Sequence, residues 1–166
     1  MGFQIYPLKA GDFFDAQRFD KYFFDSNSWI FFLKSQYYSS DPVGLLYASL
    51  FSQIITLNTS AKKVKVKPKI VVTSLLLTEV VNAYMRRIAM KEFCASTNIN
   101  YDPGKFKEDY RDKPGTDYKK QLKRFINDFN SFKDYTILQD DDFVNMDPYS
   151  ILEGLHNYNT DFNDFY

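Results

Sequence analysis

A predicted strand passes directly into a predicted helix in the run Lys69-Ile70-Val71-Val72-Thr73-Ser74-Leu75-Leu76-Leu77-Thr78-Glu79-Val80-Val81. Residues 69–72 predict a strand buried on both faces, as in a parallel sheet, because β-branched side chains pack well on a pleated surface. Thr73 or Ser74 is expected to cap the helix, which should reach about Phe93. The apolar residues at helical spacing that predict its core-facing stripe are Leu77, Val80, Val81, Tyr84 and Ile88.

Further strands and helices are predicted on both sides of this unit. Residues 22–24 form a short apolar run typical of a buried strand, and residues 29–33 either start a helix or form a second apolar segment. Asp41-Pro42 combines a helix N-cap with proline at the first helical position. The other predicted elements are a helix from Asp41-Pro42 through Ile55, an amphipathic helix at 117–132, a short strand at 135–138 and a helix after Asp147-Pro148.

This order of elements predicts an α/β fold in a single domain, residues 1–166, with a central parallel sheet flanked by helices. Residues 95–115 interrupt the pattern, because they are polar and contain Asp102-Pro103-Gly104 and Pro114-Gly115, so we expect an insertion with at most one short helix. In an open parallel sheet the ligand site lies beyond the carboxyl ends of the strands. Functional side chains are therefore expected just after the predicted strands.

The charge balance and the rare residue types exclude several kinds of site. Lys plus Arg equals Asp plus Glu at 21 each, so any polyanionic partner must meet a local basic patch. Cys94 and His156 are the single cysteine and histidine, which excludes an intrachain disulfide and a zinc site of clustered His and Cys within one chain. The sequence shows neither a leader pattern nor the roughly 18 consecutive apolar residues of a membrane span, so we expect a cytoplasmic protein without a membrane partner.

Three acidic residues far apart in the chain are candidate metal ligands. Asp25 follows the first predicted strand, Glu79 lies early in the helix after the second, and Asp164 ends the run Asp161-Phe162-Asn163-Asp164. Leucines precede Glu79, so we expect that its carboxylate is not simply solvated. Two carboxylates about 4 Å apart repel by roughly 4 kcal/mol at an effective dielectric near 20. A hard cation such as Mg²⁺ would neutralise them and bind phosphate oxygens, which favours phosphodiester hydrolysis.

Three runs, in this order, carry a family resemblance: Tyr22-Phe23-Phe24-Asp25-Ser26-Asn27-Ser28-Trp29-Ile30, then Val72-Thr73-Ser74-Leu75-Leu76-Leu77-Thr78-Glu79-Val80-Val81-Asn82-Ala83, then Asp161-Phe162-Asn163-Asp164. With the αβ pattern between them, they resemble the PIN-domain nucleases, including toxin ribonucleases of bacterial toxin–antitoxin pairs. The resemblance implies a PIN-like three-layer sandwich and a metal-dependent endoribonuclease. In it, Asp25, Glu79 and Asp164 would hold Mg²⁺ or Mn²⁺, with Asn27 and Ser74 as substrate-binding polar neighbours.

The resemblance leaves several assignments open. Asp161 is an alternative metal ligand, because it lies three residues before Asp164 on one face of a possible helix. The implied partners are RNA and an inhibitory antitoxin protein, and a homodimer stays open. Family members continue through a helix and a strand to a fourth acidic residue, whereas this sequence ends at Tyr166. Reading Thr160-Asp161 as that last motif, with Asp147 as the third acid, would leave too little chain between them for the helix and strand. We therefore expect either a C-terminally truncated fragment of a longer gene product or a degenerate member.

Each candidate also has a purely structural interpretation. Asp25 could be a turn residue or a helix cap, and Glu79 could be a surface residue paired with Arg86 or Arg87. The other candidates could be acids at a helix N-terminus or local backbone hydrogen-bonders: Asp161, Asp164, Asn27 and Ser74. The chain would then be a non-catalytic PIN-like module that binds RNA or a protein partner.

Two groups of basic residues are either RNA contacts or solvated surfaces. The first is an acid-free stretch before the second predicted strand, with Lys62, Lys63, Lys65, Lys67 and Lys69. The second lies on the helix predicted at 117–132, with Lys119, Lys120, Lys123 and Arg124. Aromatic rings that we expect to offer stacking surfaces near the second group are Tyr101, Tyr110 and Tyr118.

Overall fold

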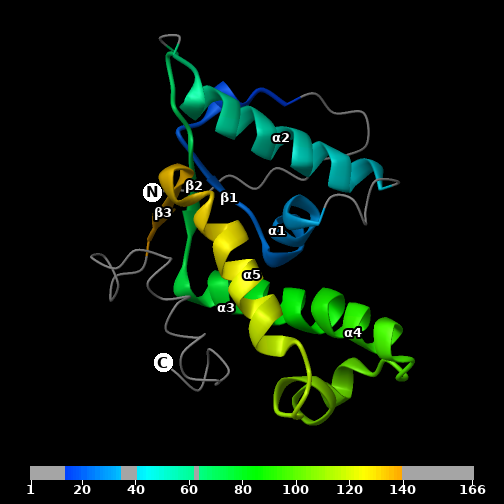
Figure 1. The fold of residues 1–166 in the computed structure, drawn as a ribbon. Coiled ribbons are helices and arrows are strands. Elements are labelled where there is room, and N and C mark those ends of the chain that lie inside the picture. The colour runs from blue at the N-terminus through cyan, green and yellow to red at the C-terminus, as the bar shows by residue number, and fades with distance from the viewer. Residues whose placement is uncertain (1–13, 35–40, 62–63, 140–166) are drawn as a thin grey trace.

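The computed structural model describes residues 14–34, 41–61 and 64–139, which form an α/β fold (Figure 1). Its sheet has three parallel strands in the order β1-β2-β3. They are β1 (Lys21–Phe23), β2 (Lys69–Val72) and β3 (Thr136–Leu138). The three predicted strands and their parallel arrangement are confirmed.

Five α-helices connect and cover the strands within the described residues, together with short 3₁₀ and π turns. They are α1 (Ser26–Leu33), α2 (Pro42–Thr59), α3 (Ser74–Tyr84), α4 (Met90–Thr97) and α5 (Tyr118–Asn130). Asp41 caps α2 with Pro42 at the first helical position, as predicted, and the predicted amphipathic helix is α5. The helix expected after Asp147-Pro148 lies outside the described residues. No described helix has the length and apolar character of a membrane span.

The sheet uses its two faces differently. Alternate residues of the strands, such as Tyr22, Ile70 and Val72, belong to the core that the helices share. Phe23, paired in register with Val71, points to the opposite face and is 54% exposed. Val71 on that face is nevertheless buried, so the face is exposed at the edge strand β1 rather than throughout. This arrangement is compatible with a three-layer sandwich.

Trp29 of α1 stands where three helices meet. It is fully buried, with its ring centroid 5.1 Å from that of Phe51 of α2 and 5.1 Å from that of Phe129 of α5. Phe51 also stacks on Phe24, directly after β1, at 4.3 Å. Aromatic pairs at such separations stabilise a core beyond the area that they bury. These aromatic contacts fix α1 against α2 and α5, and they fix the segment after β1 against α2.

The helix after β2 runs further than predicted. It passes from α3 through a π turn, Met85–Ala89, into α4, and ends at Thr97 rather than near Phe93. Asn98 closes it in a left-handed conformation with φ of 55°. Asparagine tolerates this conformation better than most residues, so it is a suitable helix terminator.

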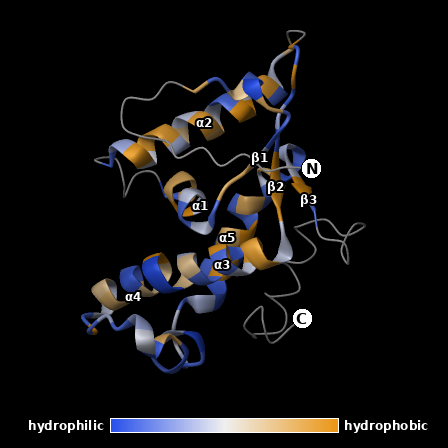
Figure 2. Ribbon diagram, turned by 180° about the vertical axis from the view of Figure 1, so that it is seen from behind, coloured by the Kyte–Doolittle hydropathy of each residue, from blue (hydrophilic) through white to orange (hydrophobic). Residues whose placement is uncertain are grey.

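The polar segment at 95–115 is anchored more firmly than a surface insertion would be. Figure 2 shows the largely hydrophilic segment after α4 in blue, yet Phe106 and Tyr110 from it are fully buried. The Arg86 guanidinium lies 4.8 Å from the centroid of the Phe106 ring. The Tyr110 hydroxyl donates a hydrogen bond of 2.8 Å to Asp117 Oδ1. Besides the end of α4, the segment holds one 3₁₀ turn, Pro103–Lys105, and one π turn, Lys107–Arg111.

Candidate functional site

The candidate site lies at the carboxyl edge of the sheet, where two helices that contact each other begin. Phe23 of β1 pairs with Val71 of β2, so Asp25 and Thr73 occupy equivalent positions beyond neighbouring strands. Asp25 is the N-cap of α1 and Thr73 is the N-cap of α3, and the two helices pack on each other. Both helices thus start beyond the paired residues at the same edge of the sheet. This edge is where an open parallel sheet places its ligands.

Asp25 is exposed, and its carboxylate is only partly occupied by its structural role. Oδ1 accepts hydrogen bonds from the Ser28 backbone N–H at 2.8 Å and from the Ser28 hydroxyl at 2.6 Å. Oδ2 has no hydrogen-bond partner among the described residues. The helix-cap interpretation is therefore confirmed. Among the described residues, the geometry also leaves one carboxylate oxygen, held in a fixed orientation, free to bind a cation.

Glu79 differs from the expectation in one respect. It lies on the exposed side of α3, so the prediction that its carboxylate is not simply solvated is wrong. The leucines before it diverge on the helix: Leu76 and Leu77 are buried, whereas Leu75 points outward. Residues adjacent in sequence point in different directions around a helix, so apolar neighbours in the chain do not make an apolar environment. Glu79 stands six residues beyond Thr73, which is about 9 Å along the helix axis.

Asn27 is hydrogen-bonded to Arg87, a partner that the sequence did not suggest. Arg87 Nη1 donates a hydrogen bond of 3.0 Å to Asn27 Oδ1, which joins α1 to the π turn Met85–Ala89. A π turn is rare and often occurs at a functional site. Asn27 and Arg87 are both exposed, so the bonded pair adds an amide and a cation to the surface near Asp25.

Neither arginine pairs with Glu79 in the way that the structural interpretation suggested. Arg87 is bonded to Asn27, while Arg86 packs on Phe106 and donates a bond of 3.4 Å to the Pro103 carbonyl. Within the described part of the chain, the Glu79 carboxylate has no ion pair or hydrogen bond. As far as these residues go, it is a second oxygen donor group without a partner, on the helix that starts at the same sheet edge.

Ser74 is the first residue of α3 and is half-buried. Its carbonyl accepts a bond of 2.9 Å from the Thr78 hydroxyl, while Thr73, not Ser74, caps the helix through Oγ1 and the Leu76 N–H at 3.1 Å. Ser74 is therefore a backbone acceptor within its own helix. Its place at the sheet edge is as expected.

The remaining predicted ligands, Asp161 and Asp164, lie outside the described residues. Within residues 14–34, 41–61 and 64–139, no group of three His, Cys, Asp or Glu side chains is close enough to hold a metal ion together. The described part of the site therefore offers two acidic side chains, Asp25 and Glu79, on two packed helices. Carboxylate oxygens are the donors that Mg²⁺ and Mn²⁺ prefer, so these residues suit such an ion.

The two basic groups lie in different parts of the fold. Lys65 and Lys67 are exposed but precede β2, at the amino edge of the sheet, away from Asp25. Lys69 Nζ donates to the Asp134 carbonyl at 2.6 Å. The α5 group is exposed, but two of the rings expected to stack on RNA beside it, Tyr110 and Tyr118, are buried in the core, so that expectation is wrong.

The local pattern relates Arg87 only to Glu79, because both lie in the helix predicted to reach about Phe93, and it gives no sign of the contact with Asn27. The actual partner, Asn27, is 60 positions away. Local spacing carries no signal for a contact over that separation.

Comparisons of the chain with protein-family models, with curated proteins and with solved structures find no match.

Proposed function

We propose that this protein is a PIN-like, metal-dependent endoribonuclease whose site lies at the carboxyl edge of the sheet, and that it acts as the toxin of a toxin–antitoxin pair. The proposal includes Asp25 and Glu79 as ligands of Mg²⁺ or Mn²⁺, completed by Asp164 or Asp161. It also includes the PIN-like form of the three-layer sandwich.

One observation carries the proposal. Asp25 lies two residues after β1, and α3, which bears Glu79, starts two residues after the end of the neighbouring parallel strand β2. Two carboxylates separated by more than fifty positions thus lie on helices that start at the same edge and pack on each other. This is the topology in which distant acidic residues can share one cation.

The side chains support distinct parts of this activity. Asp25 is oriented by its bonds to Ser28, so that Oδ2 is presented to solvent in a defined direction. Glu79 is exposed and without a partner among the described residues, so binding a cation would not require a bond to be broken. Arg87, held by Asn27, places a positive charge that suits a phosphate group of the substrate. A bound divalent ion would supply charge neutralisation and activation of water for attack at phosphorus.

The first test is a titration of Mn²⁺ followed by thermal unfolding. An ion that binds only the native state must raise the melting temperature, by an amount equivalent to about 2.7 kcal/mol when its concentration is 100 times its Kd. We expect the shift in the parent protein and its loss in Asp25→Asn and in Glu79→Gln. Cleavage of a labelled RNA should be lost in the same two variants and in the presence of a chelator.

Asp41→Asn is the matched control. Asp41 caps α2 through Oδ1, with bonds to the N–H groups of Val43 and Gly44, as Asp25 caps α1. The substitution removes the same charge from the same kind of helix cap, so it reproduces any effect of capping alone. A parent protein whose melting temperature does not change with millimolar Mn²⁺ would contradict the proposal. An equal loss of the shift in Asp41→Asn would contradict the assignment of Asp25.

The alternative is a non-catalytic PIN-like module that binds RNA or a protein. The capping role of Asp25 favours it, because that role accounts for an aspartate at this position without a metal. In this case RNA binding would persist in Asp25→Asn and Glu79→Gln and would be indifferent to metal.

A further inference from the structure

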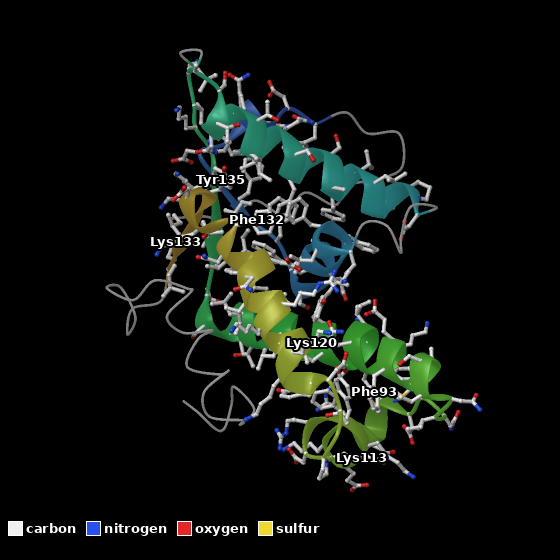
Figure 3. All side chains as sticks on the ribbon, viewed as in Figure 1. Phe93, Lys113, Lys120, Phe132, Lys133 and Tyr135 are labelled. Carbon is white, nitrogen blue, oxygen red and sulfur yellow. The ribbon has the colours of Figure 1, made fainter. Side chains whose placement is uncertain are left out.

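Helix α5 carries a dense set of positive charges on its exposed side. Figure 3 labels Lys120, one of these residues, on α5. The set, called here the α5 cationic face, consists of Lys119, Lys120, Lys123 and Arg124, all exposed. The opposite side of the helix is buried and consists of Leu122, Phe125, Ile126 and Phe129. The charges are therefore fixed in place by a helix whose other side is part of the core.

The α5 cationic face is not arranged for the stability of the helix. Lys119 and Lys123, and Lys120 and Arg124, are like-charge pairs at a separation of four residues, which destabilise a helix by about 0.2–0.5 kcal/mol per pair. Lys119 and Lys120 are in the first turn of α5, where the helix dipole disfavours cations. A local arrangement that opposes two stability rules at once points to a function.

Neighbouring acids do not compensate for these charges. None of the four side chains has an ion pair or hydrogen bond within the part of the chain that the structure describes. The sequence contains no acid from Tyr118 to Asn127, and Asp128, four residues after Arg124, forms no ion pair with it in the structure. Asp117 precedes the face, but its carboxylate accepts bonds from Tyr110 and Gln121. With respect to residues 14–34, 41–61 and 64–139, the four cations are thus available to an external anion.

The cationic face also lies toward the edge of the sheet that carries Asp25. The C-terminal end of α5 leads through a short turn into the start of β3, so α5 runs back along the sheet from its carboxyl edge to its amino edge. All four cations are in the first half of α5. Lys113, before the helix, is also exposed (Figure 3).

We propose that the α5 cationic face binds the phosphate backbone of a single-stranded RNA. Three of its four residues are lysines, which are depleted in the centre of protein–protein interfaces, and α5 exposes no large apolar side chain that could form such a centre. Lysine ammonium groups bind phosphates as point charges. The choice of RNA over another polyanion rests on the proposed ribonuclease function, whereas the location on α5 does not.

The mode of binding follows from the same residues. Tyr110 and Tyr118 are buried and unavailable for base stacking, so the face contacts phosphates rather than bases. Binding is therefore independent of sequence and strongly dependent on salt. For a single strand, the slope of log K against log salt is about −0.7 per phosphate contact.

The test is the binding of a short fluorescein-labelled single-stranded RNA, followed by anisotropy in EDTA so that cleavage does not interfere. The triple variant Lys119→Gln, Lys120→Gln and Lys123→Gln should bind roughly 10-fold more weakly or worse at about 100 mM salt, with a salt slope lower by about 2. Arginine at the same three positions should retain binding. The melting temperature of the glutamine variant should not fall, since repulsion between charges is relieved.

The matched control is the triple variant Lys21→Gln, Lys65→Gln and Lys67→Gln. These lysines are exposed at the amino edge of the sheet, and the variant has the same net charge as the α5 variant. Equal weakening in both triple variants would show a non-specific charge effect and would overturn the inference. Parental affinity in the α5 variant would overturn it as well and would favour an acidic protein as the partner. Failure of the ribonuclease proposal is distinct from both, because RNA would then bind through α5 without being cleaved in Mn²⁺.

Discussion

Arg87 donates a hydrogen bond to Asn27 at 3.0 Å, and this bond joins two segments that are 60 positions apart in the chain. Asn27 is in the first turn of α1, two residues after Asp25, and Arg87 is in the π turn that follows α3. The bond therefore links the first candidate ligand to the helix that carries the second. It also places a guanidinium group near the edge where the proposed substrate would bind.

Loss of this bond should affect activity more than stability. Asn27 and Arg87 are exposed, so the bond between them should contribute about 0.5–1 kcal/mol to folding. A double-mutant cycle of Asn27→Ala and Arg87→Gln, measured by urea unfolding, should give a coupling energy in that range. Each single variant should lose RNA cleavage by a larger factor than this energy explains. A variant that cleaves RNA as the parent does would exclude a role for Arg87 in the site.

Substitutions of Asp25 should distinguish its contribution as a helix cap to stability from the contribution of its carboxylate to metal binding. Asp25→Ala removes the acceptor for Ser28 and should destabilise the protein by about 1 kcal/mol, whereas Asp25→Ser can still cap the helix and should cost only a few tenths. Both variants remove the carboxylate, so both should lose the Mn²⁺-dependent rise in melting temperature. Unfolding with and without Mn²⁺ measures the two effects independently. A rise retained in Asp25→Ser would show that the carboxylate is not a ligand.

Trp29→Ala should be among the most destabilising single changes. The side chain is fully buried between α1, α2 and α5, and its removal leaves a cavity among Phe51, Phe129 and Phe132. Such a truncation typically costs about 3–5 kcal/mol. Chemical unfolding should show this loss, while Phe93→Ala, at a half-buried ring, should cost less. Equal losses would contradict the central place given to Trp29.

Tyr110 should make the protein sensitive to alkaline pH. Burial raises the pKa of the Tyr110 hydroxyl above its ordinary value of 10.0, and the hydrogen bond to Asp117 raises it further. The unfolded chain therefore releases this proton at a lower pH than the folded protein does. The stabilisation is fully present below pH 10, and above it stability should fall by up to about 1.4 kcal/mol per pH unit.

Tyr110→Phe tests this directly. The variant should lose stability at neutral pH, because Asp117 loses a hydrogen-bond donor, but its stability should decrease less steeply above pH 10. Guanidinium unfolding at a series of pH values measures both. Identical pH profiles for the parent and the variant would show that Tyr110 does not titrate on unfolding.

Much of the fold could be predicted because its signals are local. The β-branched run at 69–72, the cap at Asp41-Pro42 and the apolar stripe of α5 each depend on neighbours within a few residues, and the structure contains all three. The helix end at Thr97 was missed because α4 continues its backbone hydrogen bonding past Phe93 into residues 95–97, which are exposed and add nothing to the apolar stripe. The core role of Phe106 and Tyr110 was missed because they stand alone in a polar segment.

The sequence alone determined the order of strands and helices and the aspartate that follows the first strand. These features depend on backbone propensity and side-chain periodicity, which act over one or two turns. The outward direction of Glu79, the burial of Tyr118 beside exposed lysines and the partnership of Arg87 with Asn27 emerged on folding. They depend on how distant helices pack against one another and against the sheet, and packing is governed by contacts between residues that no local pattern relates.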